Sequence, residues 1–233
     1  MRVTYIHHSC FLTETAGCYY LFDYFQGTLP AMDPSKPIVV LASHRHSDHY
    51  QPAVFSQLKH LGMEHIHAVL SRDIPARLIP SHISHTIVSA DEHYVLPQGQ
   101  ALTTFRSTDE GVAFLIQDGE ALFYHAGDLN DWVWAEEPDA DNRQMTGSYR
   151  KQISLLSREL DGRSLTAAFV VLDPRQEEAY DRGLVYFLDH ISGDCIYPMH
   201  YWEQPQIIDR FLREHPRYEH RIQRTETANR KEK

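Results

Sequence analysis

Four side chains that can bind a metal ion lie within six consecutive residues, His44-Arg45-His46-Ser47-Asp48-His49. Neutral imidazole and carboxylate suit zinc, and they also suit iron and manganese. In an extended segment His44 and His46 point to the same side, because side chains alternate. Asp48 and His49 are then available to a second position as the chain turns. One loop can therefore supply ligands to two ions at the separation found in two-metal hydrolases, roughly 3.5–4 Å.

The segment that precedes this cluster, residues 38–42, is a continuous apolar run that predicts a strand buried on both faces. The cluster therefore begins where a buried strand ends. A helix is predicted directly afterwards over residues 52–61, with Gly62 as its C-cap. The order of elements predicts two sheets packed on each other with helices outside, a four-layer αββα sandwich of the α/β class.

The remaining elements follow from alternating or helical hydrophobic spacing. Further strands are predicted over residues 3–6, 10–13, 19–22, 67–70, 165–172, 195–198 and 218–223, and a meander over 86–88, 94–96, 101–105, 112–117 and 121–124. Further helices are predicted over residues 143–160, 184–191 and 204–215. We expect a single domain over residues 1–233, with a tail that is disordered from about Thr225.

Composition narrows the class of protein. The 233 residues carry a formal net charge of −10 and show no basic run before the last four residues, which disfavours a nucleic-acid substrate. The three cysteines are widely spaced and odd in number, which argues against a disulfide framework. We find no signal peptide and no apolar stretch near the ~20 residues of a membrane span. The expectation is a cytoplasmic protein with a small-molecule substrate, no membrane partner, and homo-oligomerisation left open.

The cluster matches the HxHxDH motif, and the chain resembles the metallo-β-lactamase superfamily over nearly its whole length. Three more features of that family have counterparts here: Asp23 after an early strand, Gly127-Asp128 after a late hairpin strand, and His200 after a C-terminal strand. The ending Pro198-Met199-His200-Tyr201 and the short N-terminal meander look most like the lactonase-type branch, which includes ascorbate-6-phosphate lactonase.

The resemblance implies roles for the matching residues. The implied metal ligands are His44, His46, Asp48, His49, Asp128 and His200. Asp128 is expected to bridge two ions, and Asp48 to ligate the second ion and orient or deprotonate the nucleophile. Asp23 is expected to fix the ring of a ligating histidine. A bound zinc ion lowers the pKa of water from 15.7 to about 7.

One family feature is missing, because residues 105–114 hold no third histidine for the first ion. Asp109 is the most natural substitute, since carboxylate oxygen also ligates zinc. His93 is a weaker alternative. Asp109 could instead be a loop residue that hydrogen-bonds nearby amides or a ligating histidine. The departure leaves open whether one ion or two are bound.

Three residues are candidates for contact with the substrate. Trp132 follows the Gly-Asp motif and would either wall a pocket or pack its loop on the core. Arg175 would pair with an anionic substrate group or form a structural salt bridge. His8 corresponds to a histidine near the cleft in lactonase-type relatives, or is an ordinary residue at a strand end.

The function predicted from these residues is a metal-dependent hydrolase that acts on a small-molecule ester, lactone or phosphodiester. One or two Zn²⁺ ions are the expected cofactor, with Mn²⁺ or Fe as alternatives. Two other functions stay open. One is an iron-dependent oxidoreductase on the same fold, and the other is a non-catalytic metal-binding relative.

Overall fold

The computed structural model describes residues 1–224, which form two six-stranded sheets with helices on their outer sides. The first sheet has its strands in chain order. They are β1 (Arg2–His7), β2 (Cys10–Glu14), β3 (Tyr19–Phe22), β4 (Ile38–Ala42), β5 (Ile66–Ser71) and β6 (Ser84–Val88). The pairs β1–β2 and β2–β3 are antiparallel, and the pairs from β3 to β6 are parallel.

The second sheet has its strands in the reverse of chain order. They are β12 (Ile196–Met199), β11 (Ala167–Val171), β10 (Ala121–His125), β9 (Val112–Asp118), β8 (Ala101–Arg106) and β7 (His93–Val95). The pairs from β7 to β10 are antiparallel, whereas β10, β11 and β12 are parallel. Parallel strands end at the same edge of a sheet, so the loops that follow these three strands emerge side by side.

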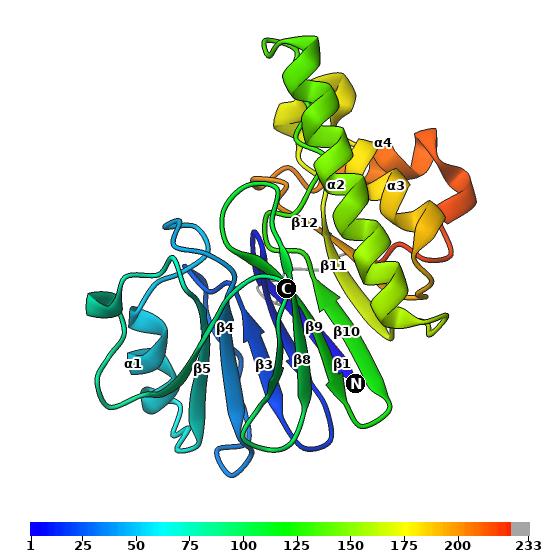
Figure 1. Cartoon of the computed structure of the whole chain (residues 1–233). Coiled ribbons are helices and arrows are strands. Elements are labelled where there is room, and N and C mark those ends of the chain that lie inside the picture. The colour runs from blue at the N-terminus through cyan, green and yellow to red at the C-terminus, as the bar shows by residue number, and fades with distance from the viewer. Residues whose placement is uncertain (225–233) are drawn as a thin grey trace.

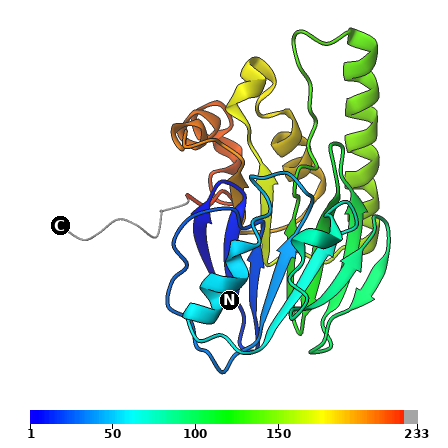
Figure 2. The same cartoon turned by 90° about the vertical axis from the view of Figure 1, so that its left-hand side faces the viewer.

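Helices cover both outer faces, and the structure is the predicted αββα sandwich. The helices are α1 (Ala53–His60), α2 (Asp139–Leu160), α3 (Arg182–His190) and α4 (Gln206–Glu214). Figure 1 shows α1 and α2 on opposite sides of the strands, and Figure 2 shows the length of α2 from the side. The helix α1 buries Val54 and Leu58 in the same hydrophobic cluster as Val40 of β4. On the other side Phe187 of α3 stacks on Tyr124 of β10, with ring centroids 5.6 Å apart.

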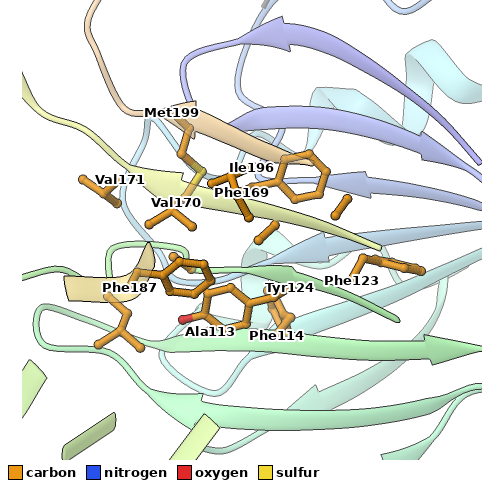
Figure 3. Close-up of a cluster of buried hydrophobic side chains, with 14 of the residues drawn as sticks. Ala113, Phe114, Phe123, Tyr124, Phe169, Val170, Val171, Phe187, Ile196 and Met199 are labelled. Carbon is orange, nitrogen blue, oxygen red and sulfur yellow. The ribbon is translucent and has the colours of Figure 1, made fainter. Parts of the chain in front are cut away.

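Aromatic rings of the two sheets contact each other, and Figure 3 shows two of those from the second sheet, Phe123 and Phe169, in their buried cluster. The ring of Phe169 on β11 lies 4.5 Å from that of Phe11 on β2, and Phe123 on β10 lies 4.9 Å from Tyr20 on β3. All four side chains are buried. Such rings supply large apolar area and preferred tilted contacts, so this layer holds the two sheets in register.

Three predicted elements differ from the structure. The helix expected from residue 143 begins at Asp139, because Pro138 and a polar first turn start it before the apolar spacing begins. The strand expected over residues 218–223 is wrong: Pro216–Tyr218 is a 3-10 turn, and only Ile222 forms a bridge, to Ile196. The segment 86–88 belongs to β6 of the first sheet and not to the meander of the second.

The predicted disordered tail from about Thr225 lies outside the described residues. Within residues 1–224, no helix combines the length and the apolar character that crossing a membrane requires.

We predict that Phe169→Ala lowers the free energy of unfolding by about 3–5 kcal/mol, because it removes a fully buried ring between the sheets. Urea denaturation followed by circular dichroism measures the change. Val95→Ala is the control, since that side chain is 78% exposed and its loss should change little. A loss below about 1 kcal/mol for Phe169→Ala would contradict the importance of this layer.

Candidate metal centre

The histidines and aspartates of the sequence motifs meet at one edge of the sandwich, in loops that follow strands. The HxHxDH segment follows β4, Asp128 is the third residue after β10, and His200 follows β12 directly. His8 joins them from the turn between β1 and β2. The parallel pairing of β3 with β4 and of β10 with β11 and β12 is what brings these loops to one edge.

A first group of potential ligands consists of His44, His46 and Asp128. His44 Nε2 lies 3.0 Å from His46 Nδ1 and 3.5 Å from Asp128 Oδ2. The other nitrogen of His44, Nδ1, lies 2.9 Å from the hydroxyl of Ser43, which orients Nε2 toward the group.

A second group consists of His8, Asp48, His49 and His200, whose ligand atoms all lie within 4.8 Å of one another. The other carboxylate oxygen of Asp128 faces this group: its Oδ1 lies 3.1 Å from His49 Nε2 and 3.4 Å from His200 Nε2. Asp128 therefore turns one carboxylate oxygen to each group.

Unsatisfied buried atoms support metal binding at the second group. His8 Nε2, His49 Nε2 and Asp128 Oδ1 are buried and make no well-aligned hydrogen bond, although the last two atoms lie 3.1 Å apart. Leaving such atoms unpaired costs about 1–3 kcal/mol each. Ligands held 2.0–2.1 Å from a tetrahedral zinc ion lie about 3.4 Å from one another, which is close to the 3.1–3.6 Å separations here. The residues present therefore fit a transition-metal ion.

Two buried carboxylates hold the ligating rings in place. Asp23 is fully buried, and it accepts hydrogen bonds from the backbone and hydroxyl of Ser43, both at 2.7 Å, and from His49 Nδ1 at 2.8 Å. Asp173, after β11, accepts from His200 Nδ1 at 2.9 Å and from the guanidinium of Arg175. Each bond fixes the ring orientation, so that Nε2 points into the centre.

The backbone around the centre adopts unusual conformations. Asp23, His8 and His200 have positive φ values of 43°, 53° and 66°. Aspartate and histidine are among the residues that tolerate this region, at a cost of about 1–3 kcal/mol each. Gly111 has φ of 72°, and a Cβ there would lie 1.9 Å from the carbonyl oxygen of Ser43, so only glycine fits.

Burial controls ionisation in the centre. It lowers the pKa of His44 to about 2 and that of His49 well below its usual value, which keeps both rings in the neutral form that binds metals. Burial, together with the charges of Asp23, Asp109 and Asp48, raises the pKa of Asp128 well above its usual value. Burial also opposes the ionisation of Asp48, but the imidazoles of His8 and His49 outweigh it and lower its pKa. A bound cation would favour the ionised form of Asp128.

Two further carboxylates, those of Asp109 and Glu110, lie near the first group but outside it. Asp109 Oδ2 lies 3.9 Å from His46 Nδ1, and the residue belongs to neither ligand group. Glu110, which the sequence did not single out, lies 3.6 Å from His46 Nε2 and pairs with Arg45. His93 lies on β7 beside Thr103 and is remote from the centre.

A cavity of about 370 Å³ opens beside the two groups. Two of the three predicted contact residues, Trp132 and Arg175, line it, whereas His8 is not among its lining residues. The other lining residues are His46, Asp48, Thr108, Asp109, Asp128, Trp134, Met145, His200 and Trp202. Trp132 and Trp134 stack on each other at 6.0 Å, and Arg175 lies 4.6 Å over the ring of Trp202. The cavity thus has aromatic walls and one cation.

Sequence reasoning missed Asp173, Ser43 and Trp202. Asp173 had a usable signal, because it directly follows a buried apolar strand, just as Asp23 does. Ser43 and Trp202 had none, since their contacts join segments that are distant in the chain.

Comparison with known proteins places these motifs in a family. Residues 2–143 match the family described as "Beta-lactamase superfamily domain". A "UPF0173 metal-dependent hydrolase" of Methylacidiphilum infernorum is 28% identical over 146 residues, which cover 55% of this chain. The match spans 62% of that relative's length.

Solved structures share the fold at low identity. Igni18, described as a novel metallo hydrolase from the hyperthermophilic archaeon Ignicoccus hospitalis, aligns with a TM-score of 0.67 and 15% identity over 97% of this chain and 94% of its own. CmlA, described as a diiron β-hydroxylase from Streptomyces venezuelae, aligns with a TM-score of 0.60 and 12% identity over 95% of this chain and 52% of its own.

We predict that Asp23→Asn weakens metal binding about 10- to 100-fold, because the amide cannot accept all three hydrogen bonds and His49 loses its orientation. Isothermal titration with Zn²⁺ gives the affinity. Asp33→Asn serves as the control, since this exposed loop residue accepts hydrogen bonds from Ser35. Equal affinity in Asp23→Asn and wild type would remove Asp23 from the supporting set.

Proposed function

The chain belongs to the β-lactamase superfamily, and from this premise we propose that it is a metal-dependent hydrolase of a small-molecule ester, lactone or phosphodiester. Zinc is the proposed cofactor, because imidazole and carboxylate are its common ligands in hydrolytic sites. The finer assignment to a lactonase-type enzyme is part of this proposal. It is supported by the ending Pro198-Met199-His200-Tyr201.

One observation carries the proposal. Imidazole and carboxylate atoms that are buried and unpaired, His49 Nε2 and Asp128 Oδ1 among them, converge at the edge of a cavity of small-molecule size. A bound transition-metal ion would supply a Lewis acid there, polarising a substrate oxygen and lowering the pKa of water.

Side chains of the protein carry out the proton transfer and hold the histidines in place. Asp48 lines the cavity with an ionised carboxylate, which can accept a hydrogen bond from the attacking water and take its proton as the water adds to the substrate. For a lactone, the water oxygen bonds to the acyl carbon, the acyl C–O bond breaks, and the proton held on Asp48 passes to the departing ring oxygen. Asp23 and Asp173 keep the histidine rings fixed throughout.

The cavity walls favour a substrate with a flat or apolar body and one negative charge. Trp132, Trp134 and Trp202 provide aromatic surface, and Arg175 provides the cation. The carboxylate of Asp173 anchors Arg175 on its inner side, which fixes the guanidinium next to the centre. A fixed guanidinium binds a carboxylate or phosphate with good geometry.

A second candidate is an iron-dependent oxidoreductase. The specific observation in its favour is the pair of carboxylates, Asp109 and Glu110, beside His46, because oxygen ligands suit iron and manganese more than a third imidazole does. Elemental analysis of protein purified without added metal distinguishes the two. Stoichiometric iron with visible absorbance would favour the oxidoreductase.

We predict that Asp128→Asn abolishes hydrolysis of a panel of lactones and phosphodiesters assayed with Zn²⁺ and Mn²⁺, by about 10³-fold or more, because both ligand groups lose their shared carboxylate. Steady-state kinetics measure the loss. Asp139→Asn, on the exposed first turn of α2, is the control and should retain full activity. Failure of the wild type to turn over any panel member with either metal would favour a non-catalytic metal-binding protein.

We also predict that Asp109→Ala selectively weakens the binding of one of two Zn²⁺ equivalents, the second one to bind, which we assign to the first group. Without Asp109 that group has only His44, His46 and the shared Asp128. Titration with a chromophoric competitor resolves the two equivalents. Glu110→Gln tests the neighbouring carboxylate in the same way. If only Glu110→Gln changes the second equivalent, Glu110 and not Asp109 completes the first group.

A further inference from the structure

The geometry points to His8 as a further metal ligand beside Asp48, His49 and His200, in the group that Asp128 Oδ1 faces through His49 and His200. This inference rests on the metal dependence proposed above. It assigns a ligand role to a residue of the N-terminal hairpin, far in the chain from the HxHxDH segment. It also makes the two metal positions unequal.

The position of the His8 ring supports a ligand role. Its side chain is 1% exposed, and Nε2 has no hydrogen-bond partner. That atom lies 3.6 Å from Asp48 Oδ2, which is too long for a hydrogen bond and close to the separation of two ligands on one ion. The ring centroid lies 4.2 Å from that of His200 and 5.8 Å from that of His49.

The surroundings hold His8 in this place. Its backbone N–H donates to the hydroxyl of Tyr5 at 2.8 Å, and its carbonyl accepts from the backbone of His200 at 3.4 Å. The ring packs against Trp202 at 4.4 Å. The left-handed backbone at φ 53° carries a cost that these contacts must offset.

Packing alone does not account for an imidazole here. An apolar side chain would fill the same space without burying an unpaired nitrogen, which costs about 1–3 kcal/mol. The neighbouring His7 shows the contrast, since its ring nitrogens face Gln26 and Glu203 near the surface. A ligand role satisfies His8 Nε2 and explains why the ring offers a ligand atom within 4.8 Å of those of Asp48, His49 and His200.

A consequence follows for the order of metal binding. The second group then offers three imidazoles and the carboxylate of Asp48, whereas the first offers two imidazoles, and Asp128 turns one oxygen to each. The first equivalent of metal therefore occupies the second group, and the first group fills later and more weakly.

The test is a Co²⁺ titration of the full chain after chelator treatment, followed by d–d absorbance. His8→Asn is the variant, because asparagine tolerates the left-handed backbone but is too short to place a donor at the position of Nε2. We expect the first equivalent to bind at least about tenfold more weakly and its spectrum to change. The matched control His7→Asn should bind as the wild type does. Unchanged affinity and spectrum in His8→Asn would overturn the inference.

A second measurement does not depend on the variant. X-ray absorption of the wild type with one equivalent of Zn²⁺ counts the imidazoles on the ion, and we expect three. Two imidazoles would overturn the role of His8 and leave the proposed hydrolase intact. Three imidazoles in a protein that hydrolyses no panel compound would uphold His8 and count against the proposed function.

Discussion

The buried carboxylate of Asp23 is the contact on which the centre depends. It lies where β3 ends, and it accepts hydrogen bonds from groups that follow β4: the Ser43 backbone, the Ser43 hydroxyl and His49. A buried carboxylate without such donors would be strongly destabilising, so the ends of β3 and β4 are locked together. Ser43 in turn packs against Gly111 and Gly127, where a Cβ would collide with it. The position of Asp128 therefore follows from that of Asp23.

In each sheet an aspartate that follows a strand bonds to the Nδ1 of a histidine. In the first sheet Asp23 follows β3 and fixes His49, and in the second Asp173 follows β11 and fixes His200. Their charges are balanced differently, because Asp173 also pairs with Arg175 whereas Asp23 meets only neutral donors and imidazole. The centre thus gathers Asp23, Asp48 and Asp128 with Arg175 as the cation that lines the cavity, and positive ions would balance this excess of negative charge.

Local patterns were sufficient for much of the fold. The apolar run of β4 and the aromatic run of β3 have the predicted bounds, because hydrophobic content and flanking loops define them. Helix α2 was predicted to start too late, since its first turn is polar, and the segment around Ile222 was predicted as a strand although it makes one bridge only. The HxHxDH cluster, Asp23, Asp128 and His200 could be located from motif and order. Asp173 could have been singled out by its place after a buried apolar run. The contact of Ser43 with Asp23 and the inward ring of His8 could not, because only the pairing of distant segments creates their surroundings.

The contact between His8 and His200 sets the stage of synthesis at which all ligands of the second group are present. One residue lies in the first hairpin and the other after the last strand of the second sheet, and the backbone of His200 bonds directly to that of His8. A ribosome makes the chain from the N-terminus at about 5–20 residues per second, so the residues of β1 and β2 are made many seconds before those of β12. During synthesis the HxHxDH segment can take up an ion only through a partial set of ligands. Loading of the complete second group is therefore an event that follows translation, and metal supplied to a nascent chain would meet a different and weaker site.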